Sequence, residues 1–211
     1  MAKLTNDQLE SKYDQLSQYE TFFREKGYKA IAGIDEAGRG PLAGPVVAGI
    51  CILDPDTRIL GLDDSKKLTE KRREELYLEI KSKALAYATV RVEPKRIDDI
   101  NILNATKEAM RECVKRISIC PDVLLIDAVD LEGTNIKVCP IIKGDSKSNS
   151  IAAASILAKV ERDHIMQEYD NMYPGYEFGK HKGYGTKDHY AAIRNQGISD
   201  IHRKSFLKVI H

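Results

Sequence analysis

Hydrophobic and polar residues follow two different patterns along this chain. Five short, mostly apolar segments predict β-strands at residues 29–35, 45–53, 84–92, 122–127 and 136–142. Apolar residues at helical spacing predict helices within the first 27 residues, from residue 94 and at residues 69–83, 101–119, 150–169 and 186–195. An opening strand hairpin followed by alternating helices and strands predicts an α/β domain with a mixed central sheet.

The first predicted strand ends in two adjacent carboxylates, Asp35 and Glu36, and the turn Gly38-Arg39-Gly40 follows them. Neighbouring side chains on a regular strand point to opposite faces. Both carboxylates therefore serve one site only if the backbone leaves the strand there, which the glycines permit. Carboxylates gathered at a strand end are typical ligands of Mg²⁺ or Mn²⁺. A solvated acidic turn is the alternative.

Two further acids adjoin apolar segments. Asp127 ends the strand predicted at residues 122–127, and Asp145 lies just before the helix predicted at residues 150–169. That helix begins apolar nearly all round, which indicates burial against the sheet. A carboxylate at a buried strand end costs free energy unless it is paired or bound to a cation. Taken singly, Asp127 fits a turn and Asp145 a helix cap, but four such acids in one α/β chain favour a metal site.

Composition and length indicate an ordinary globular protein: 211 residues, 42% hydrophobic and 31% charged. Apolar runs stay well short of the ~20 residues that cross a membrane, and the N-terminus turns polar at once. We therefore expect neither a membrane span nor a signal peptide. The cysteines show no CxxC pair and no zinc spacing, and we predict buried free thiols in a cytoplasmic protein. They are Cys51, Cys113, Cys120 and Cys139.

The net charge of +1 is unevenly distributed. From residue 179 onwards the chain has seven Lys or Arg, two acids and four of its five histidines. A basic segment beside an acidic centre suggests a polyanionic ligand whose phosphates meet both lysines and a metal. A merely basic tail is the alternative.

Three loops carry residues suited to binding. Ser65 and Lys66 bring a hydroxyl and an ammonium group together, which suits phosphate oxygens or a solvated loop. The Gly38-Arg39-Gly40 turn exposes backbone amides, unless it is a plain tight turn. Lys182 and Tyr184 share a basic loop, and a tyrosine between two glycines is well placed to stack on a base or sugar. We expect Asp163, on the helix at residues 150–169, to be an exposed salt-bridge partner.

Several stretches resemble the type 2 ribonuclease H (ribonuclease HII) family in order, spacing and identity. They are IAGIDEAGRGPLAGPVVAG, DDSKKL, INILNAT, LLIDA, KGDSKSNSIAAASILAKVERD, HKGYGT and HRKSF. They cover nearly all of residues 30–206, and the first thirty residues lie outside the match. The stretch DAVDLEG departs from the family's usual pattern, so the resemblance implies no shape for that loop.

The resemblance implies a ribonuclease H-like fold, in which helices flank a mixed central sheet. It divides the chain into a helical accessory segment (residues 1–28) and a catalytic domain (residues 29–211) with a helical extension from about residue 172. It implies Mg²⁺- or Mn²⁺-dependent endonucleolytic cleavage of RNA in RNA–DNA hybrids, and incision 5′ of single ribonucleotides in duplex DNA. The products would carry 3′-hydroxyl and 5′-phosphate ends, and no obligate protein partner is expected.

The resemblance also assigns roles to individual residues. The metal-binding, catalytic acids would be Asp35, Glu36, Asp127 and Asp145. The residues that contact nucleic acid would be Gly38, Arg39, Gly40, Ser65, Lys66, Lys182 and Tyr184. Among these, the Gly38-Arg39-Gly40 turn and Tyr184 would sense the ribose 2′-hydroxyl, the group that distinguishes RNA from DNA.

Two other functions fit some of these features. A different nuclease on a similar sheet, such as a junction resolvase, predicts cutting of all-DNA duplexes or four-way junctions. A non-catalytic nucleic-acid-binding protein predicts binding without metal and without product. The clustered acids oppose the second alternative, because they would repel phosphate unless neutralised.

Overall fold

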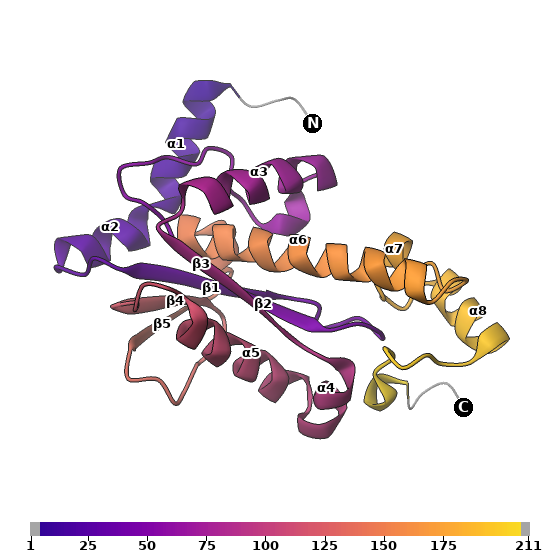
Figure 1. The fold of residues 1–211 in the computed structure, drawn as a ribbon. Helices are drawn as coiled ribbons and strands as arrows, with labels where there is room; N and C mark the ends of the chain where they lie inside the picture. The colour runs from indigo at the N-terminus through magenta and orange to yellow at the C-terminus, as the bar shows by residue number, and fades with distance from the viewer. Residues whose placement is uncertain (1–4, 208–211) are drawn as a thin grey trace.

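A five-stranded mixed sheet forms the centre of the computed structural model, which describes residues 5–207 (Figure 1). The strands are β1 (Ile31–Ala37), β2 (Val46–Ile52), β3 (Ala86–Val92), β4 (Val123–Asp127) and β5 (Lys137–Ile141). Their order is β3-β2-β1-β4-β5, with antiparallel pairs β1–β2 and β2–β3 and parallel pairs β1–β4 and β4–β5. The predicted opening hairpin and mixed sheet are confirmed. Lys208 and His211 of the basic segment lie outside the described residues.

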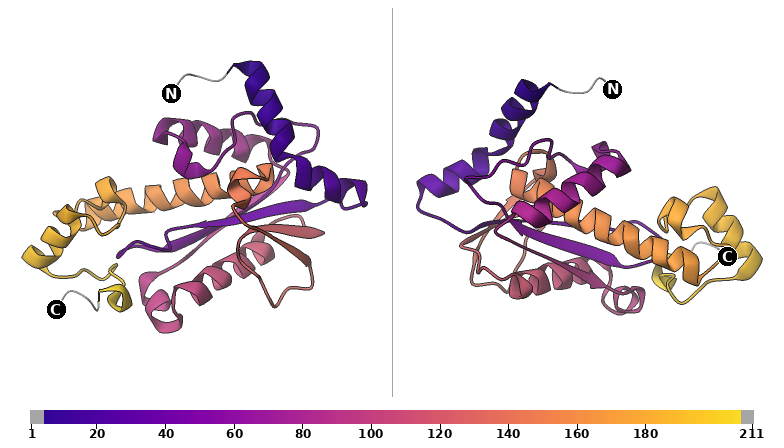
Figure 2. Two further views of the ribbon diagram at one scale, coloured as in Figure 1. Left: turned by 180° about the vertical axis from the view of Figure 1, so that it is seen from behind. Right: turned by 45° about the horizontal axis from the view of Figure 1, so that its top comes forward.

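Helices cover both faces of the sheet (Figures 1 and 2). Helices α3 (Glu70–Lys83) and α6 (Asn149–Met172) lie on one face, and α4 (Pro94–Ile100) and α5 (Ile102–Arg116) lie on the other. Helices α1 (Asn6–Leu16) and α2 (Gln18–Glu25) lie near the start of α6, whereas α7 (Phe178–His181) and α8 (Lys187–Gln196) lie at its far end. Short 3₁₀ turns occur at Ser65–Lys67, Gly144–Ser146 and Lys204–Phe206.

Helix α6 lies unusually close to the sheet because glycines face it. A Cβ atom added at Gly33 would lie 2.0 Å from the carbonyl carbon of Ser150. One added at Gly49 would lie 2.5 Å from the carbonyl oxygen of Ala154. The buried alanines of α6 leave room for this approach, as expected for a helix that is apolar nearly all round.

Successive side chains of strand β1 point to opposite faces of the sheet along its whole length, including at Asp35 and Glu36. Ala32 and Ile34 pack in the core formed with α5, whereas Ile31 packs with Ile151 of α6. The pairing of β1 with β2 continues to Ala37, so the backbone does not leave the strand at Asp35. The expectation of a departure there is wrong. Asp35 faces the α6 side and Glu36 the opposite side, because successive strand residues alternate.

The N-terminal segment forms two helices that attach to the start of α6. Glu20 of α2 is buried, and its Oε1 accepts hydrogen bonds from the Ser148 hydroxyl (2.7 Å) and the Ser150 N–H (2.8 Å). Asn149 donates from Nδ2 to the Tyr13 carbonyl at 2.9 Å. A carboxylate at a helix N-terminus satisfies free amides there and interacts favourably with the helix dipole. The segment therefore supports the part of the chain that carries Asp145.

Two expectations about burial are wrong. Cys51 and Cys113 are buried, but Cys139 is half-buried and Cys120, in the turn before β4, is exposed; all four are free thiols. Asp163 is buried rather than exposed, with Lys159 Nζ 2.5 Å from its carboxylate. Within the described residues, no helix combines the length and hydropathy that a membrane crossing requires.

Candidate active site

Three of the predicted acids converge at one edge of the sheet. Asp35 and Asp127 follow paired residues of the parallel strands β1 and β4, and Asp145 lies in the 3₁₀ turn before α6. Each offers a carboxylate oxygen, and these oxygens all lie within 4.8 Å of one another. The carboxyl ends of parallel strands share one sheet edge, which is why acids far apart in sequence meet here.

Backbone amides orient two of these carboxylates. Gly144 N–H donates to Asp127 Oδ1 at 2.7 Å, and Glu36 N–H donates to Asp35 Oδ1, also at 2.7 Å. Ala128 (φ 49°) and Lys143 (φ 57°) both adopt left-handed conformations beside the acids. Such conformations cost non-glycine residues about 1 kcal/mol each, so surrounding contacts hold these turns in place.

The three acids repel one another in a poorly solvated place. Burial, with a further contribution from the Glu36 charge, raises the pKa of Asp35 well above its ordinary value. Burial and the charges of Asp64 and Asp127 raise the pKa of Asp145 to about 6. A cation held among these oxygens would relieve both effects, so the cluster is electrostatically suited to one.

Glu36 lies beside this cluster but outside it. Its position on the other face of β1 explains why it is absent from the three-acid group. Its Oε1 pairs with Arg39 at 3.3 Å, whereas its Oε2 is buried without a hydrogen-bond partner. Burial raises the pKa of Glu36, and Arg39 opposes that shift.

Two residues near the 3₁₀ turn at Ser65–Lys67 adjoin the acids: the N-cap residue Asp64 and, within the turn, Lys66. Asp64, which was not predicted as a site residue, lies close enough to Asp145 for its charge to raise the pKa of that carboxyl. Burial lowers the pKa of Lys66, but the charges of Asp64, Asp35 and Asp145 outweigh burial and raise it. The Lys66 ammonium is therefore close to the acidic cluster, as a phosphate-binding group would need to be.

Ser65 does not present its hydroxyl to solvent. The residue is buried, and its Oγ lies 2.9 Å from Oγ of Ser155 on α6. The Ser155 hydroxyl in turn lies beside Asp35 and opposes the rise of its pKa. In this structure the Ser65 side chain faces inward and supports Asp35 through Ser155. The expected contact of Ser65 with a nucleic-acid backbone stays a prediction.

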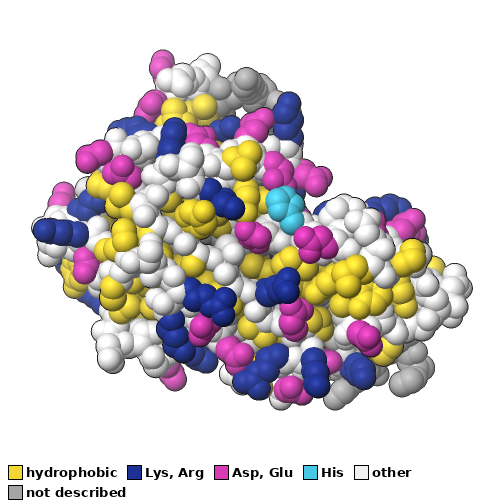
Figure 3. All heavy atoms as spheres, viewed as in Figure 1, with side chains coloured by type: hydrophobic (Ala, Val, Ile, Leu, Met, Phe, Trp, Pro, Cys, Tyr) yellow, Lys and Arg dark blue, Asp and Glu magenta, His cyan; other side chains and the backbone are white. Residues whose placement is uncertain are grey.

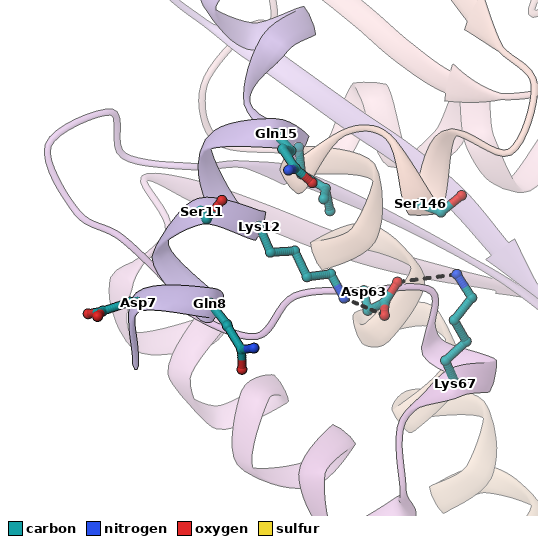
Figure 4. A pocket seen from close by; sticks show the side chains of 9 residues that line it. Asp7, Gln8, Ser11, Lys12, Gln15, Asp63, Lys67 and Ser146 are labelled. Atoms are coloured by element: carbon teal, nitrogen blue, oxygen red, sulfur yellow. Dashed lines mark hydrogen bonds and ion pairs between the residues drawn. The ribbon is translucent and has the colours of Figure 1, made fainter. Parts of the chain in front are cut away.

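Helix α1 borders the site through an ion-pair network (Figure 4). Lys12 of α1 and Lys67 both pair with Asp63, at 2.5 and 3.5 Å. These side chains line an open groove together with Ser146, the neighbour of Asp145. The accessory segment thus reaches the loops that carry Asp64 and Asp145.

A buried arginine holds the Gly38-Arg39-Gly40 turn from behind. Arg203 is fully buried and donates to the carbonyls of Gly38 (2.6 Å) and Arg39 (2.9 Å). Carbonyl and N–H groups point in opposite directions across a trans peptide. The N–H groups of Arg39 and Gly40 therefore point away from the guanidinium, towards the exposed side of the turn.

Tyr184 lies against this turn. A Cβ atom added at Gly40 would lie 3.8 Å from Cε1 of the Tyr184 ring, and that side chain is 46% exposed. Arg162 of α6 is buried and donates at 2.9 Å to the carbonyl of Lys182, which fixes the start of the tyrosine loop. The Lys182 side chain is half-buried in the same loop. The structure thus brings the glycine turn together with the loop that carries Lys182 and Tyr184, which is far from the turn in sequence.

The surface carries no single basic face in the view of Figure 3. Lys and Arg side chains lie among Asp and Glu side chains there, in keeping with the net charge of +1.

Comparison with known proteins places this chain in a family. The Ribonuclease HII family model matches residues 32–209. The chain belongs to the ribonuclease HII family. A Ribonuclease HII of Clostridioides difficile (strain 630) is 55% identical over 201 residues, which cover 95% of this chain and 79% of that protein. One of Acetivibrio thermocellus is 53% identical over 206 residues, covering 98% of this chain and 80% of that protein.

Solved structures of the ribonuclease HII family share the fold. The ribonuclease H2 of Pyrococcus horikoshii OT3 superposes with a TM-score of 0.73 at 28% identity, covering 84% of this chain and 93% of that one. Ribonuclease HII of Archaeoglobus fulgidus, solved in complex with PCNA, gives a TM-score of 0.71 at 30% identity, covering 85% and 94%. The predicted ribonuclease H-like fold, a mixed sheet flanked by helices, is confirmed. Membership of the ribonuclease HII family makes the chain an enzyme, a ribonuclease H that hydrolyses RNA in RNA–DNA hybrids.

Four residues that support the candidate site were not singled out from the sequence. They are Ser155, Arg162, Arg203 and Glu20. The first three lie in stretches that resemble the family, but each acts through contacts with residues about 119 to 165 positions away. Such contacts leave no periodic pattern in the sequence. Glu20 lies before the first residue that the family model matches.

Proposed function

We propose that this enzyme also incises duplex DNA on the 5′ side of a single embedded ribonucleotide, with Mg²⁺ or Mn²⁺. The products would carry 3′-hydroxyl and 5′-phosphate ends. One observation carries the proposal: oxygens of Asp35, Asp127 and Asp145 lie within 4.8 Å of one another. That cluster lies at the same end of β1 as the glycine turn and Tyr184.

The residues at this place fit a divalent cation. Every donor in the group is a carboxylate oxygen, the ligand type that hard cations prefer. Glu36 adds a buried oxygen, Oε2, that has no partner within the protein. Asp35, Asp127 and Asp145 would therefore hold one ion. Glu36, which acts on Asp127 from the other face of β1, would contribute to a second ion at the end of the strand. Bound there, divalent ions would neutralise phosphate charge and lower the pKa of a water molecule.

Lys66 and Lys182 would hold the phosphate backbone. The Lys66 ammonium is near Asp35, Asp145 and Tyr184, so it is near both the acids and the tyrosine loop. Its raised pKa keeps it cationic at neutral pH, and a cation there would attract a non-bridging phosphate oxygen. Lys182, two residues before Tyr184, would contact a neighbouring phosphate.

The glycine turn and Tyr184 would recognise the ribose. A 2′-hydroxyl can both donate and accept a hydrogen bond. The outward N–H groups of Arg39 and Gly40 can only donate, whereas the Tyr184 hydroxyl can do either. A 2′-hydroxyl between them would satisfy both sides, and a deoxyribose would leave them unpaired, at a cost of about 1–3 kcal/mol.

A cleavage assay tests this function. The substrate is a DNA duplex with one embedded ribonucleotide, incubated with Mg²⁺ or with EDTA, and products are sized on a sequencing gel. We expect a single cut on the 5′ side of the ribonucleotide, with Mg²⁺ only. An all-DNA duplex and a four-way junction serve as controls. Cutting of either control would favour a different nuclease, and binding without any product would contradict the proposed incision.

A further inference from the structure

Three buried histidines pack beneath the Tyr184 loop and have no role in the proposed chemistry. His181 ends α7, His189 lies in α8, and His202 precedes the last 3₁₀ turn. Their exposed fractions are 8%, 0% and 2%. The rings of His181 and His189 stack, with centroids 4.4 Å apart. The Phe178 ring packs nearly perpendicular to both of them.

The partners of His189 and His202 fix where their protons lie. His189 Nδ1 lies 2.9 Å from the Tyr184 carbonyl oxygen, which can only accept, so Nδ1 carries the hydrogen. His189 Nε2 must then accept from His202 Nε2, which lies 3.0 Å away. His202 Nδ1 in turn accepts from the Ser199 N–H at 2.9 Å. The result is a directed relay from Ser199 through both rings to Tyr184.

His181 completes a set of three neutral rings. Its Nε2 lies 2.7 Å from the Tyr176 carbonyl oxygen and therefore donates, and its Nδ1 accepts from the Gly183 N–H at 3.1 Å. All six ring nitrogens thus have a partner of the correct kind. An additional proton on His189 or His202 would place a donor against a donor, which breaks the relay.

The relay joins the two parts of the proposed ribose site. His202 forms an isolated antiparallel bridge with Ala43, just after the glycine turn. The Tyr184 carbonyl, at the other end, accepts from His189 and from the Thr186 N–H (2.8 Å). We propose that His189 and His202 are positioning residues that fix Tyr184 against the glycine turn. This inference rests on the proposed function, because it presumes that Tyr184 recognises the ribose.

The surroundings favour the neutral rings that the relay requires. Burial lowers the pKa of His189 and His202, and the neighbouring histidines lower it further. From α6, the guanidinium of Arg162 approaches the same loop at the Lys182 carbonyl. Arg203 follows His202 directly, and His181 faces the pair from α7. Burial and the close packing of the three rings therefore favour the neutral forms that the relay requires.

Two substitutions at one position separate the relay from general packing. In His189→Asn the amide nitrogen lies near the former Nδ1 and can still donate to the Tyr184 carbonyl. In His189→Gln the polar group lies near the former Nε2 and cannot. The measured quantity is the cleavage rate on a single-ribonucleotide duplex divided by the rate on a uniform RNA–DNA hybrid. We expect about a 10-fold lower ratio in His189→Gln and at most a 2-fold change in His189→Asn.

A substitution at His202 gives an independent test of the relay. His202→Asn can still accept from the Ser199 N–H but cannot donate to His189, so an intermediate loss of the ratio is expected. Thermal melting of each variant shows whether it folds. A purely structural defect would lower both rates together and leave their ratio unchanged, which would overturn the inference. So would equal ratios in the Asn and Gln variants at position 189.

Combination with Tyr184→Phe separates this inference from the proposed function. If His189 acts through Tyr184, His189→Gln should add no further loss of the ratio in the Tyr184→Phe background. If Tyr184→Phe alone leaves the ratio unchanged, the proposed role of Tyr184 fails. If Tyr184→Phe lowers the ratio and His189→Gln does not, only the relay fails.

Discussion

The backbone N–H of Gly144 donates a 2.7 Å hydrogen bond to the carboxylate of Asp127. Gly144 immediately precedes Asp145, so this bond attaches the loop that carries one acid to the strand that carries another. A Cβ atom at Gly144 would meet Ile151 of α6 at 2.5 Å, which leaves this loop little room to move. The spacing of the three acids is thus set by the fold before any ligand binds.

Neutralising one strand-end acid should stop cleavage without unfolding the enzyme. We expect Asp35→Asn and Asp127→Asn each to lower the rate by about 10²–10³-fold or more, because each removes a proposed cation ligand. Hybrid binding should persist. Asp130→Asn, an exposed neighbour in the loop after β4, is the matched control and should retain activity. Full activity in either strand-end variant would contradict the proposed site.

The same acids should destabilise the metal-free enzyme. Burial raises the pKa of Asp145 from 3.8 to about 6, so the folded state disfavours its charged form. Asp145 therefore stabilises the fold only in its protonated form. That contribution is fully present below pH 3.8 and is lost as the pH rises through about 6. In EDTA at pH 8 we expect Asp145→Asn to melt about 2–6 °C higher than the parent enzyme.

That advantage should shrink as the pH falls towards 4, because Asp145 then binds a proton in the parent enzyme too. Mg²⁺ should raise the melting temperature of the parent enzyme more than that of Asp145→Asn. Differential scanning calorimetry with and without Mg²⁺ measures both effects. Identical melting temperatures in EDTA at pH 8 would show that the acids do not strain the fold.

Arg203 should be needed for ribose recognition as well as stability. A lysine offers one ammonium group and cannot reach the Gly38, Arg39 and Gly44 carbonyls together, as the guanidinium does. We expect Arg203→Lys to lose about 2–4 kcal/mol of unfolding free energy and to prefer ribonucleotide-containing duplex less strongly. Urea unfolding and the two-substrate rate ratio measure these effects. Arg194→Lys, exposed on α8, is the control.

Glu20 should matter through its acceptor oxygen rather than its charge. Glu20→Ala leaves the Ser148 hydroxyl and the Ser150 N–H without their buried partner, which should cost about 1–3 kcal/mol. Glu20→Gln keeps an acceptor and should cost less. Urea unfolding of both variants, with exposed Glu25→Ala as a control on the same helix, tests this. A larger loss in Glu20→Gln than in Glu20→Ala would rule out the capping role.

His202 should make the fold sensitive to acid. Burial lowers its pKa from 6.5 to about 4, so the unfolded chain binds a proton more readily than the folded one. Stability should therefore fall as the pH drops from 6.5 towards 4, by about 1–3 kcal/mol from this group. His202→Asn should flatten that part of the profile. Unfolding free energies from urea titrations at pH 7 and pH 5 supply the comparison.

Periodicity predicted the sheet and its main helices because those patterns are local. It also located Asp35 and Asp127, since each ends an apolar strand. The expectation that the backbone leaves the strand near Glu36 was wrong. Strand β1 stays paired with β2 as far as Ala37, and this pairing depends on the partner strand rather than on the local sequence. The inward turn of Ser65 depends on Ser155, which lies 90 positions away. The link from Arg203 to Gly38 spans 165 positions, and no local pattern encodes it.

The contacts of α6 with Gly33 and Gly49 limit how this enzyme can be redesigned. A single methyl group at either position would meet backbone atoms that have no alternative rotamer. The close contacts therefore fix the position of α6 on the sheet. Because Asp145 lies just before α6, they also help to fix the position of Asp145. The absence of two methyl groups, at Gly33 and Gly49, therefore helps to set the distance between Asp145 and the acids on the sheet.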